Sequence, residues 1–148
     1  MMITSEITNS YLIQGVTIYE VTEKKIRRFG KLESGWHYGE GVPFQQSVLD
    51  GAISLNREAI RLAFYETDVF PGTDGEIMLV VYYGDRNLGF IFERDGSVTF
   101  CHEKGNEEIC YQEGLSSQDA RTKIAEFREK TWKESGFLVG SPSEQASA

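Results

Sequence analysis

The segment from residue 76 to residue 112 is rich in β-branched, aromatic and other apolar residues and is interrupted by short glycine-containing turns, and this pattern constrains the fold more than any other feature of the sequence. A period of two is typical of β-strands, whose successive side chains point to opposite faces of a sheet. Glycine-containing turn signals divide the segment into strands at 76–83, 86–93, 97–103 and 107–112. Such short connections join antiparallel neighbours. The segment therefore predicts a four-stranded antiparallel meander.

The lengths of the turns predict the register of this sheet. A two-residue turn at 84–85 and a three-residue loop at 94–96 keep the large apolar side chains on one face. A two-residue turn at 105–106 places Cys101 opposite Cys110. The predicted core face consists of Ile77, Leu79, Val81, Leu88, Phe90, Phe92, Val98, Phe100, Ile109 and Tyr111.

The second face of the predicted sheet is too apolar to be fully exposed to water. It carries Met78, Val80, Tyr82, Gly89, Ile91, Thr99, Cys101 and Cys110. We expect the N-terminal strands, a second subunit or another protein to cover part of it. The predicted contact residues are Met78, Val80, Tyr82 and Ile91.

One helix is predicted before the meander in the sequence, and another is predicted after it. Apolar residues recur at three- and four-residue steps over residues 44–65, which is typical of an amphipathic helix. A second helix begins at Ser116, where Asp119 completes a capping box and Leu115 precedes it as a hydrophobic staple. The predicted fold is α+β: a helix packed on the four-stranded meander, a C-terminal helix and a β-rich N-terminal segment.

The predicted domain organisation has three parts. Residues 1–35 form the N-terminal segment, where strands are expected near residues 11–13 and 16–21 and a short amphipathic turn after them. Residues 36–135 form the α+β domain. Residues 136–148, which include Gly, Ser, Pro, Glu and Ala after Phe137, are expected to be a disordered tail.

The charge balance disfavours direct binding of nucleic acid. The chain has 15 basic and 23 acidic residues, a net charge of −8, whereas nucleic-acid surfaces select basic proteins. A basic run from Lys24 to Lys31 is interpreted as a solvated surface, with contact to an acidic partner as the alternative. No apolar run approaches the ~20 residues of a membrane span. We expect a cytoplasmic protein without membrane contact.

The loop after residue 35 is the best candidate for chemistry. Trp36, His37, Tyr38 and Glu40 provide an aromatic wall, an imidazole and a carboxylate, and His with Glu can perform acid–base catalysis. No nucleophile, phosphate-binding or dinucleotide motif accompanies them. We therefore expect no catalytic residue, no metal and no cofactor, and expect Trp36 to be structural. The alternative is a small hydrolase or ligand-binding enzyme built on this loop.

The two cysteines are expected to be reduced and packed. If Cys101 lies opposite Cys110, the distance between their Cα atoms is short enough for a disulfide. A disulfide between these two cysteines is therefore the alternative to the reduced form. The same register places His102 opposite Ile109, on the other face from the thiols, so a zinc site is not expected.

The loop and the following segments carry a family resemblance. The chain reads W-H-Y-G-E-G-V-P from Trp36 to Pro43, then a helix, then P-G-T-D-G before a strand at residues 71–75. This resembles a group of small bacterial proteins of unassigned function, many with W-D-G-Y-G-A-x-P in the loop. The likeness covers about residues 32–103, and His37 and Tyr38 depart from it. It implies an α+β fold and a bacterial or phage-related setting, and it transfers no catalytic residue.

These features lead to one hypothesis with two alternatives. We expect a non-enzymatic protein–protein interaction module, antitoxin-like or an accessory subunit, whose partner is another protein. The alternatives are the small enzyme described above and a homodimeric structural module in which the second sheet face is buried between two copies.

Overall fold

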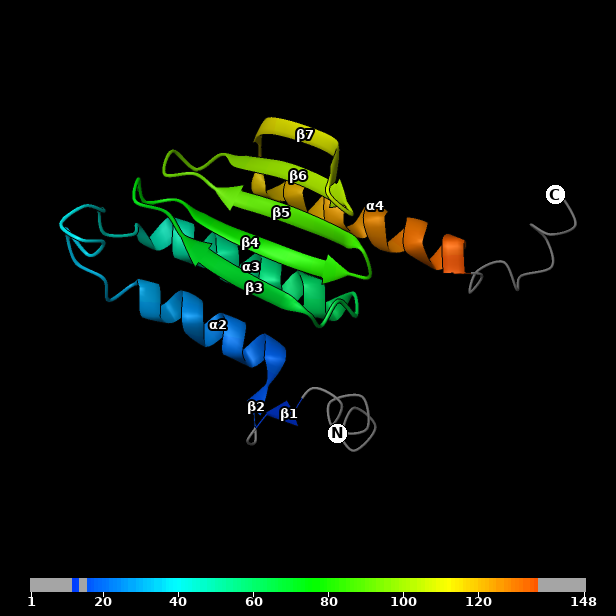
Figure 1. Ribbon diagram of the computed structural model, residues 1–148, viewed down its shortest axis with the longest axis horizontal. Coiled ribbons are helices and arrows are strands. Elements are labelled where there is room, and N and C mark those ends of the chain that lie inside the picture. The colour runs from blue at the N-terminus through cyan, green and yellow to red at the C-terminus, as the bar shows by residue number, and fades with distance from the viewer. Residues whose placement is uncertain (1–11, 14–15, 136–148) are drawn as a thin grey trace, which may run out of the picture.

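The computed structural model describes residues 12–13 and 16–135 and has an α+β fold (Figure 1). Its main feature is an antiparallel sheet with the strand order β3-β4-β5-β6-β7. The strands are β3 (Thr67–Pro71), β4 (Ile77–Tyr83), β5 (Arg86–Phe92), β6 (Val98–Lys104) and β7 (Glu107–Leu115). The helices are α2 (Ile18–Phe29), α3 (Gln46–Arg61) and α4 (Ser117–Ser135).

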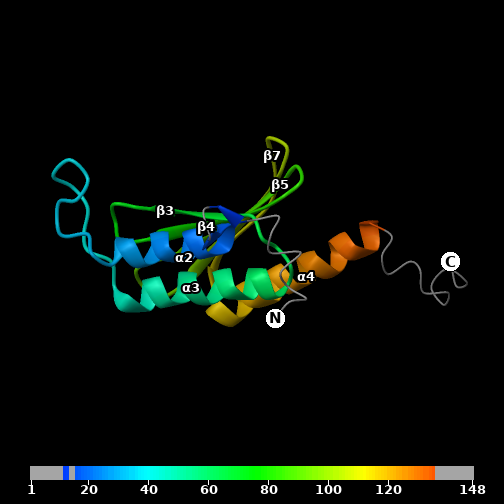
Figure 2. The ribbon, with the colours of Figure 1, turned by 90° about the horizontal axis from the view of Figure 1, so that it is seen from below.

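The three helices lie on one face of the sheet (Figure 2). Helix α3 packs on β4 and β5, α4 on β6 and β7, and α2 on β3 and α3. Two short paired strands, β1 (Leu12–Ile13) and β2 (Val16–Thr17), precede α2. Over residues 12–13 and 16–135, no element covers the opposite face of the sheet (Figures 1 and 2).

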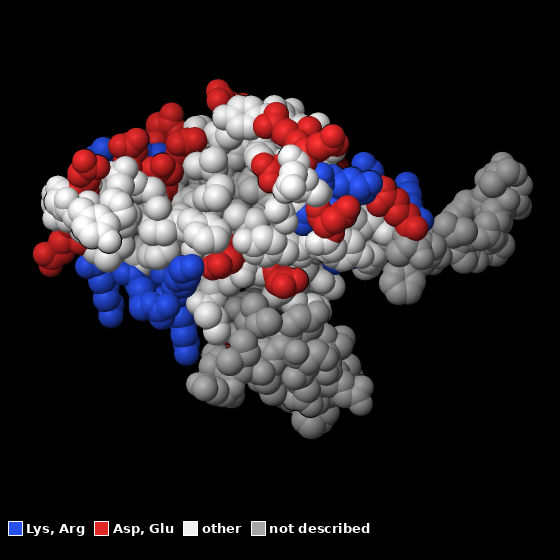
Figure 3. All heavy atoms as spheres, viewed as in Figure 1, with Lys and Arg blue, Asp and Glu red and all other residues white. Residues whose placement is uncertain are grey.

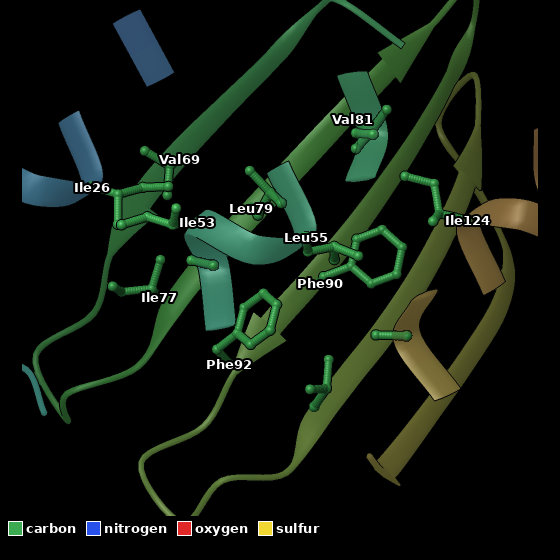
Figure 4. Close-up of a cluster of buried hydrophobic side chains, with 14 of the residues drawn as sticks. Ile26, Ile53, Leu55, Val69, Ile77, Leu79, Val81, Phe90, Phe92 and Ile124 are labelled. Atoms are coloured by element: carbon green, nitrogen blue, oxygen red, sulfur yellow. The ribbon is translucent and has the colours of Figure 1, made fainter. Parts of the chain in front are cut away.

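The core lies between the helices and the sheet (Figure 4). Leu55 of α3 and Ile124 of α4 lie beside Phe90 of β5, and all three side chains are almost completely buried. Helix α3 approaches the sheet closely at Gly51, where a Cβ atom would lie 2.9 Å from Cδ1 of Phe92. The mid-helix glycine therefore has a packing reason, although glycine lowers helix propensity.

The predicted registers of the first three meander strands are confirmed. Val81 pairs with Leu88 across β4 and β5, and Phe92 pairs with Val98 across β5 and β6. The seven apolar residues predicted for the core face of β4, β5 and the start of β6 are buried: Ile77, Leu79, Val81, Leu88, Phe90, Phe92 and Val98. Phe100 is buried as well.

The predicted register of β7 is wrong beyond its turn. Lys104 pairs with Glu107 as a two-residue turn requires, but the register shifts by one residue at Ile109. A bulge places an extra residue on one strand, so the side chains that follow it change face, until a second shift pairs Leu115 with Val98 and returns Leu115 to the core side. His102 therefore pairs with Cys110, and Cys101 with Tyr111. Ile109 and Tyr111, predicted for the core, are 52% and 50% exposed.

In the described part of the N-terminal segment, strands β1 and β2 lie where strands were predicted, but helix α2 occupies Ile18–Phe29, which corrects the strand predicted over residues 18–21. Strand propensity over residues 18–21 is overridden by the amphipathic spacing of Thr22, Ile26 and Phe29, which are buried. The Thr22 hydroxyl donates a hydrogen bond to the backbone oxygen of Thr67 at 3.0 Å. This contact fixes α2 beside β3, an edge strand that the sequence did not predict.

The ends of the helices follow local capping rules. Helix α3 ends at Arg61 rather than near residue 65, because Ala63 N–H donates to Ile60 O and Phe64 N–H donates to Ala59 O, both at 2.8 Å. This is a Schellman arrangement, with Ala63 at φ 68°. The capping box of α4 is confirmed by reciprocal hydrogen bonds between Ser116 and Asp119 at 3.0 and 3.1 Å. The predicted tail at 136–148 lies outside the described residues.

Candidate interaction surface

The four predicted contact residues lie together on the uncovered face of the sheet. Met78, Val80 and Tyr82 alternate outward along β4, and Ile91 of β5 pairs directly with Met78. Met78, Tyr82 and Ile91 are half-buried, whereas Val80 is only 7% exposed. Met78, Tyr82 and Ile91 are therefore the accessible side chains of this face, and Val80 is almost completely covered by its neighbours. We call this surface the open face.

Aromatic residues extend the open face onto both edge strands. Phe70 of β3 pairs with Met78 and is 39% exposed, and Tyr111 of β7 pairs with Cys101. The sequence did not predict these two, because β3 was not expected and Tyr111 was assigned to the core. The β-branched and aromatic residues Thr67, Val69 and Phe70 before the turn were the available signal for β3.

Acidic side chains border the apolar centre of the open face (Figure 3). Asp68 lies opposite Val80 in the register of β3 and β4. Burial, followed by the Asp68 and Glu66 carboxylates, raises the pKa of the Tyr82 phenol. Burial also raises the pKa of the Cys101 thiol, with the carboxylates of β6 and β7 as a further cause. The margin is therefore electrostatically negative where it meets the apolar centre.

One end of the open face is hollowed. A cavity of about 670 Å³ lies between the β3–β4 turn, the β5–β6 loop and the end of β7. Its lining consists of Asp74, Glu76, Glu93, Arg94, Asp95, Ser97, Thr99, Glu113 and Gly114. Hydrogen bonds order this lining: Thr99 donates to Glu93 at 2.9 Å, and Tyr111 donates to Glu113 at 2.7 Å. Five carboxylates face one arginine there, which favours a cationic group.

The basic run lies on α2 and just after it, beside the β3 edge of the sheet, where the Lys25 ammonium lies 5.0 Å from the centroid of the Phe70 ring (Figure 3). Two of its members are engaged: Lys25 pairs with Asp68 at 2.9 Å, and Arg27 pairs with Glu23 at 2.8 Å. Lys24, Arg28 and Lys31 are exposed. The surface charge is thus divided between a positive helix and a negative sheet margin.

The loop at 36–41 is a small hairpin that projects beyond the ends of α2 and α3 (Figures 1 and 2). His37 and Glu40 exchange backbone hydrogen bonds at 2.7 and 2.8 Å around Tyr38 and Gly39, which both have positive φ. This is the geometry of a type I′ turn. His37 and Glu40 are exposed, and Tyr38 is 95% exposed.

Trp36 holds this hairpin against the domain. Its indole N–H donates to Val42 O at 3.0 Å, and its ring packs on Phe44 with centroids 5.7 Å apart. A Cβ atom at Gly41 would lie 2.6 Å from the indole nitrogen, so only glycine fits beneath the ring. No side-chain hydrogen bond joins His37 to Glu40 in the described part of the chain, and neither lines the cavity. The loop does not bring an acid and a base together.

The two thiols are free and lie on opposite faces of the sheet. Cys101 lies on the open face, whereas Cys110 packs at the edge of the core beside His102. The expected Cys101–Cys110 pairing is wrong because of the bulge at Ile109. Among the described residues, no group of three or more His, Cys, Asp or Glu side chains is arranged to hold a metal ion.

Comparison with family models, with curated proteins and with solved structures gave no significant match. The resemblance to small bacterial proteins therefore stays a prediction. Within residues 12–13 and 16–135, no helix has the length and apolar character needed to cross a bilayer.

Proposed function

We propose that this chain is a non-enzymatic protein-binding module, antitoxin-like or an accessory subunit of a bacterial or phage-related system. One observation carries the proposal: the open face is apolar at its centre, and no described helix covers it. An antiparallel sheet with one face in water normally presents alternating polar residues there. Met78, Tyr82 and Ile91, which are half-buried, stand instead at those positions, with Phe70 and Tyr111 exposed on the edge strands, and an exposed apolar patch typically marks an interaction site.

The charge around the open face favours a different protein as partner over a second copy. Self-association by two-fold symmetry would place like surfaces against each other. The acidic margins of two copies would then meet, and like charges across an interface oppose association. A partner with a basic margin avoids this repulsion.

The enzyme alternative receives no support from the loop at 36–41. An acid–base pair needs side chains that converge on a substrate position. His37 and Glu40 are exposed on a hairpin, and their mutual contacts are made by the backbone. The role proposed for this loop is structural, through Trp36.

A charge-insertion experiment tests the proposed contact surface. Ile91→Glu and Met78→Glu place a carboxylate in the open face, and Val21→Glu is the matched control, because Val21 is 41% exposed on α2. Tagged full-length variants are expressed in the native host, and bound proteins are quantified by mass spectrometry. We expect one stoichiometric partner that falls at least about tenfold in both open-face variants and is unchanged in the control.

The circular-dichroism spectrum and melting temperature of each variant show whether it is folded. A partner retained by folded Ile91→Glu would contradict the proposal, as would a partner lost only in Val21→Glu. Val80 is not used for this test because its side chain is almost completely buried, so a carboxylate there would disturb folding.

A further inference from the structure

Tyr38 stands at the tip of the hairpin over residues 36–41, in a backbone conformation that does not suit its side chain. Its φ is 52°, in the left-handed region, and it occupies the first central position of the type I′ turn. Asn, Asp and Gly are favoured at this position, because a larger side chain brings its Cβ atom close to the following carbonyl group. In the described part of the chain, Ala63 is the only other non-glycine residue with a positive φ.

Packing within the fold does not explain Tyr38. Its side chain is 95% exposed, and its ring lies against the His37 ring, which is itself exposed, at a centroid distance of 4.8 Å. The anchor of the hairpin is Trp36, through its hydrogen bond to Val42 O and its contact with Phe44. A strained residue that the fold does not need points to a functional contact.

The hairpin flanks the open face at the end where the cavity lies. At the base of the hairpin, Val42 N–H donates to Thr73 O of the β3–β4 turn at 3.1 Å. The same turn supplies Asp74 and Glu76 to the lining of the cavity. Figure 2 shows the hairpin rising past the level of β3, on the side of the sheet that no described helix covers. A partner that covers the open face up to this end therefore lies beside the hairpin.

The construction of the hairpin indicates the kind of partner. Backbone hydrogen bonds and the Trp36 anchor hold the tip in place, so little conformational freedom is lost when it is bound. Glu33 and Glu40 are exposed on the loop against one exposed cation, Lys31, and carboxylates repel the phosphates of nucleic acids and anionic lipids. Tyrosine is enriched at the energetic centres of protein interfaces, because it brings a large ring with few rotatable bonds. These features favour a protein.

We propose that Tyr38 is a partner-binding residue, and that its ring enters an apolar pocket of the protein that covers the open face. The hairpin and the open face then form one composite surface, with Tyr38 at one end and the paired residues Met78 and Ile91 on the sheet. The strained conformation is retained because the projecting ring contributes to binding. The inference rests on the proposed function, because it names a further contact of the same partner.

Two substitutions that relieve backbone strain separate binding from folding. Tyr38→Asn supplies the Asn–Gly pair that a type I′ turn favours. Ala63→Gly relieves the same strain at the end of α3, on the helix side of the sheet, and is the matched control. Both variants should raise the melting temperature by about 2–4 °C. A lower melting temperature in Tyr38→Asn would show that Tyr38 supports the fold, and would overturn the inference.

Photocrosslinking of the full chain in the native host measures the binding. A benzophenone amino acid is placed at Tyr38, at Met78 or, as the control, at Val21 on α2. We expect positions 38 and 78 to give adducts with the same protein, identified by mass spectrometry, and position 21 to give none. The adduct from position 78 should fall at least about tenfold when Tyr38→Asn is added, and it should be unchanged when Ala63→Gly is added.

The outcomes separate this inference from the proposed function. A protein adduct from position 78 that is absent from position 38, or that a folded Tyr38→Asn variant leaves unchanged, overturns the inference and leaves the proposed function standing. Adducts of position 38 with nucleic acid or lipid in place of protein overturn the inference as well. A protein adduct from position 38 alone contradicts both the proposed function and the composite surface. Adducts from neither position in a folded protein contradict both.

Discussion

Arg128 of α4 is buried against the end of α3 and Tyr83 of β4, and no carboxylate in the described part of the chain pairs with it, so its replacement gives the sharpest prediction about the fold. The side chain is 6% exposed and comes from α4. Its Nε donates to Leu62 O at 2.7 Å, and its Nη2 donates to Ala63 O at 3.1 Å. Its guanidinium carbon lies 3.8 Å from the centroid of the Phe64 ring. One arginine therefore satisfies the carbonyl groups at the end of α3, where the helix dipole is negative.

The magnitude follows from these contacts. A hydrogen bond from a charged donor contributes about 1.5–3 kcal/mol, and a cation over an aromatic face about 0.5–2 kcal/mol. Desolvation opposes them, since burial lowers the pKa of the Arg128 guanidinium. We expect Arg128→Ala to lower the free energy of unfolding by about 3–5 kcal/mol, a large part of the ~5–15 kcal/mol typical of a domain. Arg128→Met keeps most of the volume and should cost about 2 kcal/mol less than alanine.

Urea unfolding monitored by far-ultraviolet circular dichroism measures these differences, with Lys133→Ala on the exposed side of α4 as the control. A loss below about 1 kcal/mol in Arg128→Ala would refute the reasoning. It would mean that water satisfies the end of α3 as well as the arginine does.

Three further predictions concern single positions. Gly51→Ala should destabilise by about 1 kcal/mol in urea unfolding, because the clash with Phe92 outweighs the gain in helix propensity; a more stable variant would contradict this. Trp36→Ala should cost about 1–3 kcal/mol by the same assay, since the ring is half-buried, and an unchanged midpoint would remove its structural role. Burial, with Arg86 and Lys130 as further causes, lowers the pKa of His102 below 6.5. The unfolded state then binds more protons below that pH, so stability falls as pH drops below about 6.5. His102→Gln should show a smaller fall in melting temperature between pH 7.5 and 5.5, and parallel curves would contradict the prediction.

The central sheet could be predicted from the sequence because its signals are local. Turn length sets the strand register and so determines which of Val81 and Val80 faces the core, and the capping box at Ser116 is read from residues three apart. The bulge at Ile109 has no comparable local signal. It shifts one strand by a residue and moves Tyr111 from the expected core to the open face.

Helix α2 and strand β3 depend on each other, which is why neither was predicted. The residues before Thr22 have strand propensity, and their helical form is stabilised by packing on β3 and α3. Strand β3 has five residues and ends in Pro71, a residue that sheets tolerate at an edge. Contacts between segments 45 residues apart, such as Thr22 with Thr67, are not visible in a single sequence.

Site-specific photocrosslinking tests the central claim, that the open face contacts another protein. A benzophenone amino acid is placed at Met78 on the open face, or at Val21 on α2 as the control, and full-length protein is irradiated in the native host. We predict a discrete adduct with a second protein from position 78 and none from position 21. Adducts only from position 21, or none from position 78 in a folded and expressed protein, would contradict the account.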